Sequence, residues 1–154
     1  MEDRFETFTV LINRISRNIR KIKNQEMAAY QLRSAHVSCL YYLFSTDGMT
    51  ATELCEHCEE DKATISRALE YLERNGYLFC ESKNPKRYKS RLHLTSKGLE
   101  VGKQISARVN GVLEEISNQL TEEERLAFYR NLSAISDGLE EIAKAAEQRK
   151  GEAL

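Results

Sequence analysis

The sequence predicts a mainly α-helical protein that carries one short β-hairpin. Among its 154 residues Pro occurs once and Trp is absent, so few residues interrupt helices. Most of the chain has apolar residues at steps of three and four, which is the period of an amphipathic helix. Only two short segments, near residues 77–81 and 91–95, have the character of strands. With 41% hydrophobic and 31% charged residues, the composition is that of a small folded domain.

The first predicted helix covers about residues 5–23 and has an apolar seam along one side. The seam consists of Phe5, Phe8, Ile12, Ile15, Ile19 and Ile22. The remaining face is basic and carries Arg14, Arg17, Arg20, Lys21 and Lys23. A basic amphipathic helix can lie on a membrane, but a seam this narrow is typical of a helix packed on other helices. We therefore expect a packed helix with a solvated basic side.

Two short helices are predicted next, at about residues 35–45 and 51–58. The first has an apolar stripe of Val37, Leu40, Tyr41 and Phe44, and Asp47-Gly48 ends it. The second begins with a capping box, because Thr50 is followed three residues later by Glu53. It turns Leu54 inward.

The fourth helix is predicted from Asp61, a favourable N-cap residue, to Asn75-Gly76, a typical C-terminal stop. Its buried stripe consists of Ile65, Ala68, Leu69 and Leu72. The strands at 77–81 and 91–95 then form a hairpin around the loop SKNPKRYKS, in which Asn84-Pro85 is a turn signal.

Two long helices complete the chain. The first covers about residues 96–119 and carries Ile105, Val109, Val112 or Leu113, Ile116 and Leu120 on its apolar side. Thr121 and Glu124 form a second capping box, and the last helix continues to about Gln148. Its seam consists of Phe128, Leu132, Ile135, Leu139, Ile142 and Ala146.

The middle of the chain forms a helix-turn-helix pattern, because residues 58–61 join two short helices tightly. The hairpin directly after the second helix makes it a winged helix-turn-helix. We therefore expect an N-terminal helix and connection at residues 1–34, a winged region at 35–95 and C-terminal helices at 96–154. The outer helices are expected to join in one compact domain.

Local charge points to double-stranded DNA, although the net charge of the chain is −1. Between residues 62 and 91 there are eight bases and three acids, and five of the bases lie within 83–91. Bases in a loop neutralise phosphates and release counterions, and a helix can enter the major groove. The residues expected to contact DNA are Lys62, Ala63, Thr64, Ser66, Arg67, Arg74, Lys83, Lys86, Arg87, Lys89 and Arg91. Arg67 is the candidate for reading guanine, and Arg74 is a candidate phosphate contact.

The stretch DKATISRALEYLERNGYL, the basic wing and LHLTSKG together resemble the MarR family of bacterial transcriptional regulators. The resemblance covers nearly the whole chain, since that family also has long flanking helices. It departs in the wing, where Asn84-Pro85-Lys86-Arg87 lacks the Asp that accompanies the wing Arg in the family. The resemblance implies a sequence-specific DNA-binding regulator, a repressor that a small-molecule effector releases. It also implies an effector cleft between the dimer helices and the winged region, where Tyr30, His36, Cys39 and Tyr42 would lie.

The outer helices predict a homodimer, as the resemblance does. Apolar stripes of this length must be buried against something, and a second copy of the chain is the simplest partner. The residues expected at the dimer contact are Phe5, Phe8, Ile12, Ile15, Phe128, Leu132, Ile135, Leu139 and Ile142. A two-fold dimer presents two recognition helices about one DNA turn apart, so the operator should be a pseudo-palindrome.

Cys55, His57 and Cys58 lie together on one short helix, as in a redox pair or half of a metal site. A zinc site needs further ligands, and the sequence has no second CxxC and no HxxxH. We therefore favour packing for these cysteines and expect neither a metal nor a cofactor. There is no glycine-rich phosphate loop and no catalytic set, so an enzyme is not expected.

Two alternative functions stay open at this point. One is a helical protein-interaction module that does not bind DNA. The other is a regulator that responds to thiol oxidation or metal through Cys55 and Cys58. No apolar run approaches the roughly 20 residues of a membrane span, and MEDRFETFTV lacks the pattern of a secretory signal. We expect a cytoplasmic protein.

Overall fold

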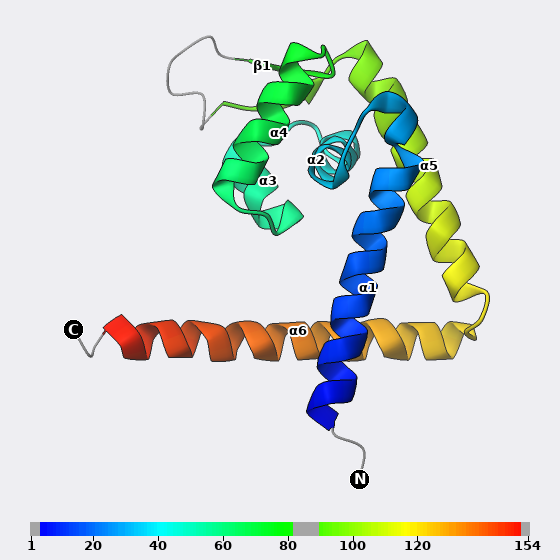
Figure 1. Ribbon diagram of the computed structural model, residues 1–154, viewed down its shortest axis with the longest axis vertical. Coiled ribbons are helices and arrows are strands. Elements are labelled where there is room, and N and C mark those ends of the chain that lie inside the picture. Colours follow the sequence, from blue (N-terminus) through cyan, green and yellow to red (C-terminus); the bar gives the residue numbers. More distant parts are fainter. Residues whose placement is uncertain (1–3, 82–89, 152–154) are drawn as a thin grey trace. The chain divides into compact units, whose positions relative to one another are not determined.

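The computed structural model describes residues 4–81 and 90–151 (Figure 1). The elements in chain order are α1 (Arg4–Glu26), the 3-10 turn η1 (Ala28–Tyr30), α2 (Ser34–Ser45), α3 (Ala51–Cys58), α4 (Lys62–Arg74), β1 (Leu78–Cys80), β2 (Leu92–Leu94), α5 (Ser96–Ser117) and α6 (Glu122–Gly151). The predicted mainly α fold with a two-stranded hairpin after a helix-turn-helix is confirmed. The turn η1 was not predicted, because its three residues carry no periodic signal.

The chain forms two compact units, one that ends at Val109 and one that begins at Asn110. In the first unit α2 is the central helix and contacts α1, α3, α4 and β2 (Figure 1). The largest fully buried side chains of the core include Leu40, Leu54, Ile65, Leu72 and Ile105. Burial of such a side chain stabilises a fold by about 1.5–3 kcal/mol relative to exposure. The core therefore holds the helix-turn-helix and the start of α5 together.

The predicted apolar stripe of α2 was wrong in part. Cys39 and Leu43 are buried, although neither belongs to that stripe, whereas Phe44 is only partly buried. A helix that other elements contact on several sides is buried beyond a single stripe, so the 3.6-residue period underestimates its burial.

The hairpin is short and antiparallel. Leu78 pairs with Leu94 and Cys80 pairs with Leu92, so both strands are two residues shorter than the sequence predicted. Met49 adds a further bridge to β2, since the Leu92 N–H donates to the Met49 carbonyl oxygen at 2.8 Å and the reverse bond is 3.3 Å. The segment between α2 and α3 thereby ties the hairpin to the helix-turn-helix, a contact that the sequence did not predict.

The segments directly before and after the hairpin, around Gly76 and around Thr95, contact each other at its base. Gly76 has a φ of +73°, in the left-handed region that Gly adopts without strain. The Thr95 hydroxyl donates to the Gly76 carbonyl oxygen at 2.7 Å and accepts from the Gly98 N–H at 3.1 Å. Gly98 lies so close to the Tyr77 backbone that a Cβ there would stand 1.9 Å from the Tyr77 carbonyl oxygen. The end of α4 and the start of α5 are therefore joined through the Thr95 hydroxyl and the close contact at Gly98, and the chain leaves α4 through the left-handed φ of Gly76.

The second capping box opens α6 as predicted. The Glu124 N–H donates to the Thr121 hydroxyl at 3.3 Å, and the Glu124 carboxylate accepts from the Thr121 N–H at 2.8 Å. The bonds that the Glu124 carboxylate accepts from the Thr121 N–H and from the Thr121 hydroxyl hold the pKa of Glu124 below its ordinary value. No helix among residues 4–81 and 90–151 is long and apolar enough to cross a membrane.

Candidate nucleic-acid interface

The candidate interface begins with the tight turn between α3 and α4. Thr50 and Glu53 form the predicted capping box at the start of α3. Glu59 has a φ of +51° and ends α3. Asp61 then caps α4, because its carboxylate accepts the Thr64 N–H at 2.9 Å. The predicted caps of both helices are confirmed, and they fix where α4 starts.

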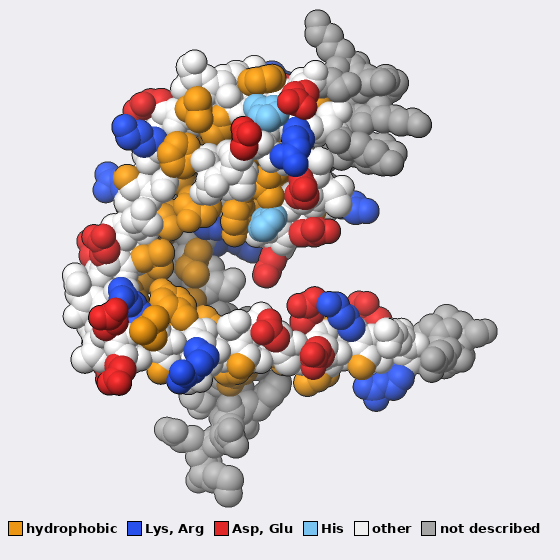
Figure 2. All heavy atoms as spheres, turned by 180° about the vertical axis from the view of Figure 1, so that it is seen from behind, with side chains coloured by type: hydrophobic (Ala, Val, Ile, Leu, Met, Phe, Trp, Pro, Cys, Tyr) orange, Lys and Arg blue, Asp and Glu red, His pale blue; other side chains and the backbone are white. Residues whose placement is uncertain are grey.

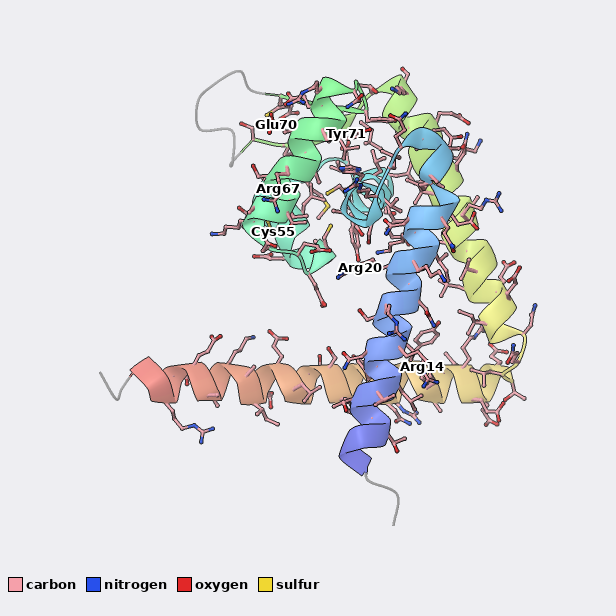
Figure 3. The ribbon with its side chains drawn as sticks, viewed as in Figure 1. Arg14, Arg20, Cys55, Arg67, Glu70 and Tyr71 are labelled. Carbon is pink, nitrogen blue, oxygen red and sulfur yellow. The ribbon has the colours of Figure 1, made fainter. Side chains whose placement is uncertain are left out.

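The first turns of α4 present a polar face to solvent. Ile65, Ala68 and Leu72 are buried on the opposite side. On the free side Lys62, Ala63, Ser66 and Arg67 are exposed, and Thr64 is partly exposed. Figure 3 shows Arg67 and Glu70 on the side of α4 away from α2 and Tyr71 on the side of α2. The predicted DNA-contacting residues of this helix therefore share one accessible face.

Hydrogen bonds order the side chains at the start of this face. The Thr64 hydroxyl donates to the Asp61 carboxylate at 2.7 Å, and Arg67 Nη2 donates to the Thr64 hydroxyl oxygen at 3.3 Å. The bonds from Thr64 hold the pKa of Asp61 below its ordinary value, so its carboxylate is charged at neutral pH. The guanidinium of Arg67 therefore lies over the first turn with most of its N–H groups unused by these bonds.

Arg74 and Arg91, two further predicted DNA contacts, also have partners within the chain. Arg74 forms an exposed ion pair with Glu70 at 2.7 Å. Arg91 Nη1 donates to the Gly48 carbonyl oxygen at 2.9 Å and to the Asp47 carbonyl oxygen at 3.3 Å. An exposed ion pair is worth about 0–1 kcal/mol, so Arg74 can exchange Glu70 for a phosphate. Arg91, in contrast, links the wing to the turn between α2 and α3, a role that the sequence did not suggest.

The wing itself lies outside the described residues. This applies to Lys83, Lys86, Arg87 and Lys89, and to the position of the missing Asp. Their contact with DNA stays a prediction from the sequence.

A groove of about 540 Å³ lies between α3, α4 and the hairpin. Its walls include Cys55, Lys62, Ser66, Leu69 and Cys80. Since Lys62 and Ser66 also belong to the exposed face of α4, the groove opens beside the candidate DNA-contacting residues. Cys55 therefore faces this groove, whereas α3 packs on α2 on another side.

The four residues predicted at an effector cleft contact neighbours within the first unit. The Tyr30 hydroxyl is hydrogen-bonded to the Gln104 side chain, and His36 stacks on Tyr71 with a centroid distance of 4.4 Å. Burial and the nearby Arg33 lower the pKa of His36. None of the four residues lines the groove beside α4. Their role in effector binding stays a prediction.

Of the remaining two residues, Cys39 is buried and Tyr42 is partly buried. Cys39 has no exposed surface, and the Tyr42 ring lies 5.3 Å from the His57 ring. Burial and the nearby Cys58 raise the pKa of Tyr42. Within the described part of the chain, no group of three or more His, Cys, Asp or Glu residues could hold a metal ion.

Comparison with known proteins gives one relative and several solved structures. No protein-family model matches the chain. The chain is 27% identical over 117 residues to the uncharacterised HTH-type transcriptional regulator YwoH of Bacillus subtilis (strain 168), which covers 76% of this chain and 85% of that protein. A transcriptional regulator of the MarR family from Silicibacter pomeroyi is 28% identical with a TM-score of 0.70, and the match covers 81% of this chain and 84% of that one.

Two further structures agree in fold at lower identity. The MepR–DNA complex of S. aureus gives a TM-score of 0.75 at 20% identity, with 86% of this chain and 97% of that chain covered. NMB1585, a MarR family regulator from Neisseria meningitidis, gives 0.78 at 17% identity, with 92% and 97% covered. The predicted fold and the resemblance stated from the sequence are therefore confirmed.

Proposed function

We propose that this chain, which resembles the MarR-family regulators in fold and in sequence, is a DNA-binding transcriptional regulator that acts as a homodimer. The observation that carries the proposal is the exposed polar face on the first turns of α4, opposite the buried side chains of Ile65, Ala68 and Leu72. In a helix-turn-helix the second helix enters the major groove with its N-terminal residues at the base edges. The face of Lys62, Ser66 and Arg67 stands at that end of α4.

The side chains of this face suit different contacts. Arg67 offers the forked guanidinium that recognises guanine O6 and N7. Ala63 and Ser66 are small, so the backbone of α4 can approach the bases closely. Lys62 at the helix start and the wing bases suit phosphates, whose contacts position the protein without reading the sequence.

The test is a binding titration on duplex DNA that was selected from genomic fragments with the purified protein. Arg67→Ala should weaken binding to the selected site by about 5- to 150-fold and relax its sequence preference, since a bidentate base contact is worth about 1–3 kcal/mol. Lys103→Ala is the matched control, because it removes one exposed positive charge from α5. Equal affinities of Arg67→Ala and Lys103→Ala would contradict the assignment of α4.

The wing has its own test. Lys86→Ala combined with Arg87→Ala should weaken binding to all sequences and flatten the salt dependence, because phosphate contacts release counterions. If the unaltered protein has negligible affinity for random duplex DNA even at low salt, it is instead a protein-interaction module, and the proposal fails.

The homodimer is proposed from apolar side chains that the chain leaves exposed. On α1, Ile15 is 50% exposed, and on α6 Leu139 and Ile142 are 52% and 65% exposed. Phe8, Ile12, Phe128, Leu132 and Ile135 are exposed as well, and the side chain of Phe5 lies outside the described residues. Figure 2 shows hydrophobic side chains at intervals along α6 between charged ones. Stripes of this length favour burial against a second copy.

Sedimentation equilibrium tests the dimer. Ile15→Asp combined with Leu139→Asp should shift the protein to monomers, because both carboxylates would enter the proposed contact unpaired. Leu99→Asp is the matched control, since Leu99 is 49% exposed on α5 and outside the predicted contact. A monomeric unaltered protein at micromolar concentration would refute the homodimer.

Repression, and release by a small molecule, follow from the same resemblance. We infer that an effector binds near Tyr30, His36 and Tyr42, where aromatic rings and hydroxyls are available to an aromatic ligand. A reporter under a promoter that carries the selected site tests the direction of regulation. Deletion of the gene should raise the reporter signal, and a lower signal would indicate an activator.

A further inference from the structure

Hydrogen bonds join three side chains in a row at the start of α4. Asp61 Oδ1 accepts the Thr64 N–H at 2.9 Å, and Asp61 Oδ2 accepts the Thr64 hydroxyl at 2.7 Å. Arg67 Nη2 donates to the Thr64 hydroxyl oxygen at 3.3 Å. Thr64 therefore stands between the N-cap of the helix and the residue that is proposed to read guanine.

The direction of each bond in this row is fixed. A charged carboxylate only accepts hydrogen bonds, so the single hydroxyl proton of Thr64 is donated to Asp61. The bonds from Thr64 lower the pKa of Asp61, which keeps this carboxylate charged at neutral pH. Toward Arg67 the Thr64 oxygen is an acceptor, and the charge of Asp61 strengthens it by polarising the hydroxyl.

Thr64 is poorly suited to contact a phosphate, although the sequence predicted that it contacts DNA. Phosphate oxygens are acceptors, and the hydroxyl proton of Thr64 is already donated to Asp61. Thr64 is also only partly exposed, whereas Ala63, Ser66 and Arg67 beside it are exposed. Its hydroxyl is therefore better matched to the guanidinium of Arg67 than to the DNA backbone.

The carboxylate of Glu70, which could compete with Thr64 for Arg67, is engaged elsewhere. Glu70 lies on the same side of α4 as Arg67 (Figure 3) and three residues after it, a spacing at which an ion pair can form. In the structure the Glu70 carboxylate pairs with Arg74 at 2.7 Å. Arg67 therefore keeps its bond to Thr64, and its guanidinium lies over the first turn of α4.

We propose that Thr64 is a positioning residue, which holds the Arg67 guanidinium in place and thereby sets how strongly the protein prefers guanine at the base that Arg67 reads. The inference rests on the proposed function. A mobile Arg side chain loses rotamer freedom when it docks, and this loss weakens the contact. A guanidinium restrained beforehand loses less, and its bond to Thr64 leaves the other N–H groups for guanine O6 and N7.

A binding titration with two duplexes tests the effect on preference. One is the selected duplex, and the other has A·T in place of the G·C pair at which Arg67→Ala relaxes the preference. Thr64→Val removes the hydroxyl but keeps the shape of the side chain, so it should reduce the ratio of the two affinities by about two- to tenfold. Thr64→Ser should keep the ratio of the unaltered protein. Thr46→Val, which removes another exposed Thr hydroxyl, is the matched control and should also keep it.

A double-mutant cycle shows whether the effect passes through Arg67. In an Arg67→Ala background Thr64→Val should change the affinity ratio no further, because no guanidinium is left to hold. An equal loss of preference in both backgrounds would overturn the proposal. If Thr64→Val does not fold, Asp61→Asn takes its place, since the Asn amide N–H can donate to the Thr64 oxygen in competition with Arg67. An unchanged ratio in Asp61→Asn would then overturn the proposal.

Nitrogen-15 relaxation of the Arg67 Nε–H group in the free protein tests the restraint without DNA. The order parameter should be lower in Thr64→Val than in the unaltered protein and in Thr64→Ser, and equal values would refute the positioning role. A lower order parameter with an unchanged affinity ratio would refute the link to guanine preference. Absence of duplex binding by the unaltered protein would refute the proposed function, whereas the order parameters would still decide whether Thr64 holds Arg67.

Discussion

The contact between Gly98 and the Tyr77 backbone gives the sharpest test of how the wing is attached to α5. In Gly98→Ala the new Cβ would meet the Tyr77 carbonyl oxygen at 1.9 Å and the Tyr77 carbonyl carbon at 3.0 Å. Real Cβ atoms essentially never approach closer than 3.0 Å, so α5 or the start of the hairpin must move by more than an ångström. A backbone oxygen cannot rotate out of the way as the end of a side chain can.

The magnitude follows from three contributions. Overpacking costs about 1–3 kcal/mol, and a rigid backbone neighbour places Gly98→Ala at the upper end. The Tyr77 carbonyl oxygen accepts bonds from the Thr95 N–H at 3.0 Å and the Thr95 hydroxyl at 3.2 Å, which the movement strains. Weakening of these two bonds lowers the free energy of unfolding by about 1 kcal/mol more. Replacing Gly by Ala in a helix raises it by about 1 kcal/mol. The free energy of unfolding should therefore fall by about 2–3 kcal/mol.

Urea unfolding followed by circular dichroism measures this change, at one protein concentration because a dimer makes stability concentration-dependent. The matched control is Gly111→Ala, also on α5, where a new Cβ meets nothing within 4 Å. The control should gain about 0.5–1 kcal/mol from helix propensity. If Gly98→Ala is as stable as Gly111→Ala, the close contact at the hairpin base is not what the structure indicates.

Three further predictions concern the turn, the cap and the glycines. Arg91→Lys should lower the free energy of unfolding by about 1 kcal/mol, because an ammonium does not reproduce the guanidinium hydrogen bonds to the two carbonyl oxygens. Urea unfolding measures this change. An unchanged unfolding midpoint would contradict the role of Arg91 in tying the hairpin to the turn before α3. Asp61→Asn keeps an N-cap acceptor but cannot ionise. The pKa of Asp61 is lower in the folded protein than in the unfolded chain, so its charge stabilises the fold fully above the unfolded pKa of about 4 and no longer does so below the folded pKa. The difference in free energy of unfolding between the unaltered protein and Asp61→Asn should therefore shrink as the pH falls below about 4. Gly76→Ala should cost about 1–2 kcal/mol through its positive φ alone, whereas Gly48→Ala should cost more, since its Cβ would also stand 2.5 Å from the His93 ring; equal thermal midpoints would refute the difference.

The sequence predicted most elements well where local chemistry decides them. The caps at Thr50, Asp61 and Thr121 form as expected, because each depends on a side chain and a backbone N–H three residues away. The stop at Gly76 likewise follows from the conformational freedom of Gly. The buried stripe of α4 followed from the helical period for Ile65, Ala68 and Leu72, whereas Leu69, also predicted in that stripe, is only partly buried and lines the groove.

Contacts between distant segments were not predictable in the same way. The sequence predicted that Arg91 contacts DNA together with the other basic residues of the wing. In the structure Arg91 donates hydrogen bonds to the carbonyl oxygens of Asp47 and Gly48, more than forty residues earlier. The bridge between Met49 and Leu92 was missed for the same reason. Charge and periodicity describe a residue among its sequence neighbours, and neither indicates which backbone groups the fold brings beside it.

The cysteines illustrate the difference between what the sequence determined and what only the tertiary structure decided. The sequence by itself determined a winged helix-turn-helix with an exposed polar face on α4, because periodicity, caps and local charge act within a few residues. It also placed Cys55 and Cys58 one turn apart on α3, and it could offer only that pair as a redox unit. Only the tertiary structure decided that Cys39 is fully buried and that Cys55 lines the groove beside α4, since such surroundings arise when several helices pack in one core.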